Sequence, residues 1–148
     1  MPYLSGPIHT GGPVLDVLVG VPAARVALLQ RHGFAVPEPV HVRALIDTGA
    51  TLSAFTPRVF TALDLRSLDQ IEVLTPSTRP DAPHSFERYQ VALALVAEGR
   101  SCPFPDTLAI AADCWLEDEG MEALIGRDIL DHCFFQYLGP DRRFTLAF

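Results

Sequence analysis

Runs of apolar residues along the chain predict a fold built mainly from strands. The segment Val14 to Val21 is almost wholly apolar, rich in β-branched residues and closed by Pro22. A second segment, Val40 to Ile46, also predicts a strand and runs directly into Asp47. Between Phe86 and Gly99 the large residues Tyr89, Val91, Leu93 and Leu95 alternate with Gln90, Ala92 and Ala94, which is typical of a strand with one buried face. We expect these three segments to form the body of a sheet.

Shorter apolar segments predict two hairpins. Ile71 to Leu74 and the strand that begins at Phe86 bracket the polar, proline-rich stretch Thr75 to Ser85, so we expect a long hairpin there. A further strand is expected around Thr107 to Ala111. The chain ends in a second hairpin that turns at residues 139–141 and carries apolar residues at alternate positions. Because chain ends are usually polar and loose, we expect this strand to be held in a sheet, which a second subunit could complete.

Three helical segments are expected between the strands. Ala23 to His32 has helix-forming residues and ends at a glycine suited to a C-cap. Thr56 and Pro57 have the capping and first-turn preferences of a helix start. A third helix-like segment, Gly120 to His132, is interrupted by Gly126. The predicted fold class is therefore all-β with short helices.

Length, composition and charge limit the classes of function. The chain has 148 residues, enough for one domain, and we expect a flexible N-terminal arm over residues 1–12 followed by one domain over residues 13–148. The net charge of -7 opposes binding to nucleic acid. The sequence contains no apolar run long enough to cross a membrane, so no membrane partner is expected. The hydrophobic fraction of 49% indicates a surface that a partner covers, and a second copy of the chain is one candidate.

The cysteines indicate a reducing compartment. The 3 cysteines are an odd number, and their spacing fits neither a disulfide framework nor a zinc site. The N-terminus lacks the basic and then apolar pattern of a signal peptide. We therefore expect a cytoplasmic protein with free thiols and without a metal or another cofactor.

Two alternative sites stay open on the residues alone. Cys133 with His41 or His132 as its base would make a thiol-dependent hydrolase, although nothing in the sequence orients these side chains. The acidic run 117–119 could hold a cation, but it lacks flanking oxygen ligands at loop spacing and is better interpreted as a solvated turn.

One acid stands where burial is costly. Asp47 directly follows the apolar triplet Ala44-Leu45-Ile46 and begins the sequence Asp-Thr-Gly-Ala. The segment Ala123 to Leu130, with the sequence Ala-Leu-Ile-Gly-Arg-Asp-Ile-Leu, precedes the terminal hairpin. The two motifs, in this order and before such a hairpin, resemble the paired signatures of retropepsin-like aspartic proteases. The resemblance implies a closed, barrel-type β fold and an aspartic endopeptidase that acts on peptides or proteins.

The same resemblance implies a homodimer, because the chain has a single Asp-Thr-Gly motif and the reaction needs two carboxylates around one water. Each subunit would donate its Asp47 at a two-fold axis. Two unit charges about 4 Å apart at an effective dielectric constant near 20 repel by roughly 4 kcal/mol, so one Asp47 stays protonated while the other ionises. The dyad therefore shares one proton.

Residues beside the catalytic aspartate are assigned supporting roles by the resemblance. Thr48 would link the two loops across the axis, and Gly49 would let the substrate backbone approach. Ala50 replaces a hydroxyl residue of pepsin-like relatives, which implies a weakly acidic pH optimum. Arg127 lacks the acidic partner of viral relatives and must find another. The remaining support residues would pack behind the loop and are Leu124, Ile125 and Gly126.

The tip of the long hairpin corresponds to the substrate-covering flap of these proteases. Viral flap tips are rich in glycine, whereas Thr75 to Ser85 contains three prolines and no glycine, which implies a stiffer flap. A catalytically weak dimer that binds peptides is therefore the alternative function. The expected flap residues are Thr75, Pro76, Ser77, Thr78, Arg79 and Pro80.

Overall fold

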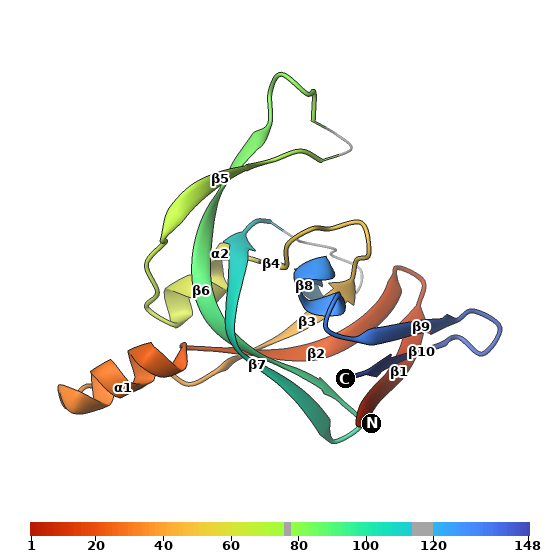
Figure 1. Cartoon of the computed structure of the whole chain (residues 1–148), viewed down its shortest axis with the longest axis horizontal. Helices are drawn as coiled ribbons and strands as arrows, with labels where there is room; N and C mark the ends of the chain where they lie inside the picture. The colour runs from red at the N-terminus through yellow and green to blue at the C-terminus, as the bar shows by residue number, and fades with distance from the viewer. Residues whose placement is uncertain (76–77, 114–119) are drawn as a thin grey trace.

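The computed structural model describes residues 1–75, 78–113 and 120–148 (Figure 1). Strands dominate these residues, and short helices lie between them. The elements in chain order are β1 (Tyr3–His9), β2 (Gly12–Gly20), α1 (Ala23–Arg31), β3 (Val40–Ile46), β4 (Ala54–Phe55), α2 (Pro57–Ala62), β5 (Asp69–Val73), β6 (His84–Ala97), β7 (Arg100–Ala111), β8 (Met121–Ile125), α3 (Arg127–Leu130), β9 (Phe134–Leu138) and β10 (Arg143–Ala147).

Six strands close into a barrel, which confirms the predicted fold class. Their order is β2-β3-β8-β4-β7-β6, and an antiparallel pairing of β6 with β2 joins the two ends. The β3–β8 and β4–β7 pairs are parallel, and the other pairs are antiparallel. Apolar residues at alternate positions fill the interior because successive side chains of a strand point to opposite faces. Members of this buried core include Val17, Val19, Val42, Ala44, Leu93, Leu95, Ala123 and Ile125.

The terminal strands form a three-stranded extension of the barrel. Strand β10 pairs with β9 on one side and with β1 on the other, and β1 continues into β2. The prediction that the C-terminal strand is held in a sheet is confirmed. Both neighbours of β10, which are β1 and β9, come from the same chain.

The prediction of a flexible arm over residues 1–12 is wrong. Leu4, Gly6 and Ile8 are buried at alternate positions of β1, and the segment is a regular strand. A Cβ atom at Gly6 would lie 2.7 Å from the Phe144 ring, so this glycine permits close packing rather than looseness. The abundance of glycine and proline concealed the period-two pattern.

The prediction of a helix-like segment over Gly120 to His132 is also wrong for its first half. Residues 121–125 form β8, in which Met121, Ala123 and Ile125 are buried and the residues between them are half-buried. Parallel pairing with β3 satisfies the backbone of this strand. The helix is limited to the four residues of α3.

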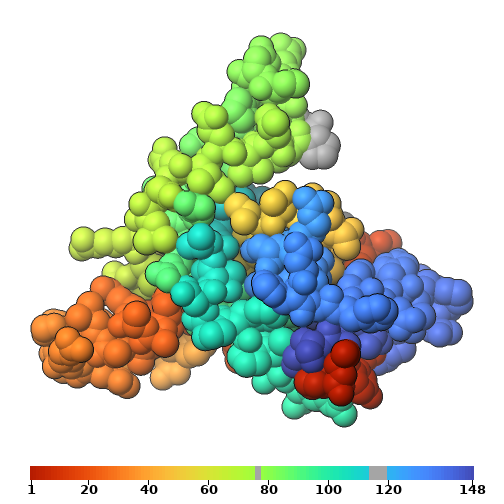
Figure 2. All heavy atoms as spheres, in the orientation of Figure 1, coloured from red at the N-terminus to blue at the C-terminus, as the bar shows by residue number. Residues whose placement is uncertain are grey.

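The expected hairpin of β5 and β6 is present and projects from the barrel (Figure 1). One end of β6 pairs with β5, and the other end pairs with β2 in the barrel wall. Figure 2 shows the hairpin standing out from the body above the yellow surface formed by residues near position 50. The strand predicted at Thr107 to Ala111 is the end of the longer β7.

The helix α1 lies beside the barrel and extends away from it (Figure 1). It confirms the predicted helix at Ala23 to His32 within one residue, and α2 confirms the helix start at Thr56 and Pro57. None of the residues of α1 is fully buried. Within the described residues, the structure has no helix long and apolar enough to span a membrane.

Candidate active site

Asp47 lies where two parallel strands of the barrel end side by side. Ile46 is the last residue of β3 and pairs with Ile125, the last residue of β8. The Asp47 backbone N–H donates to the Ile125 carbonyl at 2.9 Å, so the ladder continues one residue past the strand. The Asp47 residue is half-buried, whereas Ile46 and Ile125 are buried. The apolar run thus anchors the acid at the rim of the barrel.

The loop after β3 turns tightly around the Asp47 carboxylate. The Gly49 N–H donates to Asp47 Oδ1 at 2.9 Å, and the Ala50 N–H donates to the Asp47 carbonyl at 3.2 Å. A Cβ atom at Gly49 would lie 3.1 Å from Oδ1, which explains locally why a glycine suits this position. Thr48 and Gly49 are exposed in the single chain. The outer backbone of the loop is therefore accessible in the single chain.

The second motif packs its backbone directly on this loop. A Cβ atom at Gly126 would lie 2.7 Å from the Leu52 carbonyl carbon and 3.0 Å from the Ala50 oxygen. The Arg127 N–H donates to the Ala50 carbonyl at 2.9 Å. The structure therefore brings together the Asp-Thr-Gly-Ala loop and the segment that begins at Leu124. Ile125 and Gly126 are buried, and Leu124 is half-buried.

Among the described residues, the guanidinium of Arg127 contacts the loop that carries Asp47. Its Nη2 atom donates to Thr51 Oγ1 at 3.2 Å, and its Nη1 atom donates to the Thr48 carbonyl at 3.5 Å. The side chain is exposed. Both of these acceptors are uncharged atoms of the loop.

Sequence reasoning missed a side-chain network beneath the loop. The carboxylate of Asp128 accepts hydrogen bonds from both the N–H and the hydroxyl of Ser53, and the Ser53 Oγ accepts one from the Gly126 N–H. Ser53 is completely buried. The detectable signal was a hydroxyl residue inside the apolar run Leu52-Ser53-Ala54-Phe55, where an unpaired hydroxyl is costly.

Of the six residues expected to form a flap, the four that the structure describes lie toward the end of the projecting hairpin. The Thr78 hydroxyl and the Thr78 N–H both donate to the Thr75 carbonyl, at 2.7 and 2.9 Å. Arg79 and Pro80 are exposed. In Figures 1 and 2 the hairpin stands above the yellow surface formed by residues near position 50, to which the loop that carries Asp47 belongs. The other two expected flap residues, Pro76 and Ser77, lie outside the described residues.

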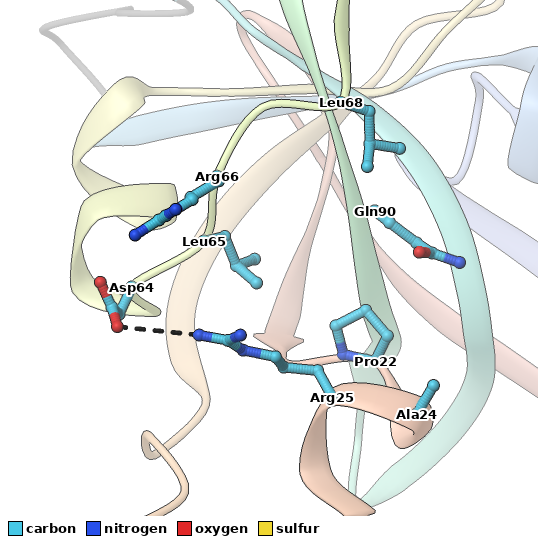
Figure 3. Close-up of a pocket in the computed structure, with 8 residues that line it drawn as sticks. All are labelled: Pro22, Ala24, Arg25, Asp64, Leu65, Arg66, Leu68 and Gln90. Carbon is cyan, nitrogen blue, oxygen red and sulfur yellow. Dashed lines mark ion pairs between the residues drawn. The ribbon is translucent and has the colours of Figure 1, made fainter. Parts of the chain in front are cut away.

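Two surface pockets lie near α1, away from the loop that carries Asp47. Figure 3 shows one of them, between the start of α1 and the connection from α2 to β5. Arg25 and Asp64 border both pockets and form an ion pair at 3.9 Å. Asp47 lines neither pocket.

The structure disfavours the thiol-dependent alternative. Burial raises the pKa of the Cys133 thiol, which keeps it in the weakly nucleophilic protonated form. Burial, and to a smaller extent the nearby Cys133, raise the pKa of Cys102 to about 11. His41 Nε2 lies 3.3 Å from an Asp16 carboxylate oxygen, on the barrel wall.

The acidic run 117–119, which was considered as a cation site, and Cys114 lie outside the described residues. Across residues 1–75, 78–113 and 120–148, the side chains form no group of three or more His, Cys, Asp or Glu that could hold a metal ion.

Comparisons with known proteins give a structural match. No family profile matches the chain, and no curated protein matches it. A retropepsin-like aspartic protease from Rickettsia conorii superimposes with a TM-score of 0.56 and 14% identity, over 98% of this chain and 89% of that chain. A retroviral protease-like domain of Ddi1 from Leishmania major aligns at 15% identity and a TM-score of 0.45, over 92% of this chain and 94% of that chain. The EIAV protease with the inhibitor HBY-793 aligns at 18% identity and a TM-score of 0.39, over 81% of this chain and 86% of that chain.

Proposed function

We propose that this chain, which has the retropepsin-like fold, forms a homodimeric aspartic endopeptidase in which each subunit supplies Asp47. The observation that carries the proposal is the placement of Asp47. Its carboxylate stands at the end of a barrel strand, on an exposed loop held against the Leu124–Arg127 segment by backbone hydrogen bonds. The chain carries one such motif, so a complete pair of carboxylates requires a second copy.

The two carboxylates would divide the work of peptide hydrolysis. The ionised Asp47 removes a proton from the bound water, whose oxygen attacks the scissile carbonyl carbon. The protonated Asp47 of the other subunit donates a hydrogen bond to the carbonyl oxygen as negative charge develops there. The proton taken from water then passes to the leaving amine as the C–N bond breaks. The reaction needs neither a covalent intermediate nor a metal.

The hairpin of β5 and β6 would cover the substrate. An extended peptide placed over the loop that carries Asp47 lies on the side of the molecule toward which the hairpin projects (Figure 2). Backbone groups of the tip could pair with the peptide as one strand pairs with another. The Thr78 hydroxyl and N–H already donate to the Thr75 carbonyl, so these two residues are held together before any peptide binds.

We also propose a cytoplasmic location. Among the described cysteines, Cys102 and Cys133 are free thiols, which suits a reducing compartment.

The decisive experiment compares wild type with Asp47→Asn on a peptide library. We expect wild type to cleave internal peptide bonds and Asp47→Asn to be slower by about 10²- to 10⁴-fold, because the substitution removes the acid–base group. Light scattering should give the same dimer mass for both. Asp141→Asn, in the exposed turn before β10, makes the same chemical change outside the site and should cleave at the wild-type rate.

Equal cleavage by wild type and Asp47→Asn, or a strictly monomeric active protein, would contradict the aspartic mechanism. Saturable peptide binding by both variants without cleavage by either would establish the peptide-binding alternative.

A further inference from the structure

Ser53, in the loop before β4, Gly126, directly after β8, and Asp128, in α3, form a hydrogen-bond chain to which the proposed reaction assigns no role. The Gly126 N–H donates to Ser53 Oγ at 3.1 Å. The Ser53 hydroxyl donates to Asp128 Oδ1 at 2.9 Å, and the Ser53 N–H donates to Asp128 Oδ2 at 3.0 Å. Ser53 has an exposed fraction of 0%, so water does not compete for these bonds. Each carboxylate oxygen thus receives one donor of the same buried residue.

The number of donors favours a carboxylate at position 128. A hydroxyl has one hydrogen, and Gly126 uses a lone pair of the Ser53 oxygen, so the hydroxyl hydrogen is directed to Asp128. An ionised carboxylate accepts at both oxygens, whereas the amide of asparagine accepts at one. Asparagine at this position would leave one donor of Ser53 buried without an acceptor.

The hydrogen-bond chain attaches the C-terminal end of the loop that carries Asp47 to α3. The loop is attached at its start, where the Asp47 N–H donates to Ile125 at 2.9 Å, and near its middle, where the Arg127 N–H donates to Ala50 at 2.9 Å. Its end is attached at Ser53 through side-chain atoms. The first two attachments use only backbone atoms, whereas the third, like the contacts of the Arg127 guanidinium with Thr48 and Thr51, depends directly on side-chain identity.

We propose that Asp128 is a positioning residue for Asp47, acting through Ser53 and the loop backbone. The inference rests on the proposed function. Two Asp47 carboxylates must meet around one water, and a misplacement of about 1 Å can cost about 10²-fold in rate. Fixing both ends of a seven-residue loop, residues 47–53, limits the displacement of the carboxylate in each subunit.

The first test is kinetic. Asp128→Asn should lower kcat by about 10- to 100-fold with KM changed less than about threefold, and the dimer mass should be unchanged. Asp131→Asn removes the same charge three residues later and should leave both constants unchanged. A loss confined to KM or to dimer mass would overturn the positioning role.

A double-variant cycle tests whether Asp128 acts through Ser53. Ser53→Ala should lower kcat to a similar extent, and adding Asp128→Asn to it should change kcat less than about threefold, because one amide oxygen suffices for the remaining N–H. Additive losses would contradict the route through Ser53. Should Asp128→Asn fail to fold, Ser53→Ala alone supplies the kcat, KM and exchange measurements.

Amide hydrogen exchange tests the effect of Asp128 on the loop independently of peptide cleavage. Asp128→Asn should speed exchange at residues 48–53 and Gly126 by about tenfold or more relative to Asp131→Asn. Equal exchange in these two variants would overturn the inference whether or not the protein cleaves peptides. Faster exchange, together with equal cleavage by wild type and Asp47→Asn, would uphold the role of Asp128 in the loop and reject the protease.

Discussion

At the scale of single residues, the site depends on backbone segments that approach too closely for a side chain. Gly126 is the clearest case, because a Cβ atom there would lie 2.7 Å from the Leu52 carbonyl carbon and 2.8 Å from its oxygen. Neither atom can move without shifting the loop that carries Asp47. The glycine therefore affects stability and geometry together.

Gly126→Ala should destabilise the fold by about 1–3 kcal/mol, because the added methyl group overpacks against backbone. Urea denaturation followed by circular dichroism measures the change. Gly139→Ala is the matched control, since the nearest atom to its Cβ would lie at an ordinary contact distance of 3.6 Å. Equal stability of both variants would show that the loops can separate at little cost.

The pH dependence of cleavage is a second property set by single residues. The Asp47 carboxylate accepts a hydrogen bond from the Gly49 N–H, and Ala50 has no hydroxyl with which to add another. Because fewer donors stabilise the ionised form less, we expect a weakly acidic optimum. A profile of kcat/KM against pH that peaks below about pH 3 would contradict this expectation.

Much of the site was accessible from the sequence because its motifs are local. Asp47 and Gly126 stand out because each directly follows an apolar triplet, and Gly49 belongs to the motif that begins at Asp47. The pairing of Asp128 with Ser53 was not accessible, because the two residues are 75 positions apart and only the fold brings them together. Although Asp128 lies in the first turn of α3, its side chain binds the neighbouring loop.

At the scale of secondary structure, one ion pair joins α2 to the barrel. Arg58 of α2 makes a two-pronged contact with Glu122 of β8, and the half-buried Glu122 side chain is 17% exposed. The hydrogen bond from Arg58 lowers the pKa of Glu122 below its ordinary value. The pair holds the helix that follows the Asp47 loop against the strand that precedes Gly126.

Glu122→Gln should lower the free energy of unfolding by about 0.5–1 kcal/mol at pH 7, a value that allows for solvent screening of the exposed Arg58. Because the folded-state pKa of Glu122 is lowered, its contribution is present above the unfolded-state pKa and is lost as pH falls through the folded-state pKa. The difference from wild type should therefore disappear in acid. Urea titrations across this pH range test it, with Glu72→Gln on the exposed face of β5 as control.

Period-two patterns predicted the long strands well, but they failed where the alternation was short. Residues 121–125 offer five positions, too few to separate a strand from a helix by pattern alone, and the following Gly126 resembled a helix interruption. The parallel neighbour β3 decides the outcome, because it supplies the hydrogen-bond partners that make β8 a strand. That pairing joins residues far apart in sequence.

At the scale of the whole molecule, both ends of the chain belong to the folded body. Strand β1 lies between β2 and β10, and Leu4 is completely buried there. Composition predicted the opposite for the N-terminus, because glycine and proline usually mark loose segments. Packing against Phe144 and Leu146 overrides that local tendency.

Leu4→Ala should therefore cost about 2–5 kcal/mol, as expected for a large-to-small change in a core. Thr10→Ala, in the exposed turn between β1 and β2, should change stability by less than about 0.5 kcal/mol. Chemical denaturation of both variants provides the comparison. A small effect of Leu4→Ala would mean that the first strand adds little to the fold.

The continuity of β6 has a mechanical consequence. One end of this strand belongs to the barrel wall, and the other end is one arm of the hairpin. The pairing of β6 with β7 shifts register between Val91 and Leu93, near the point where these two parts of the strand meet. An irregular ladder bends there more readily than a regular one. If the tip of the hairpin lifts to admit a long polymer, β6 would bend at this point. The rate at which the polymer enters would then depend on how easily the barrel wall bends.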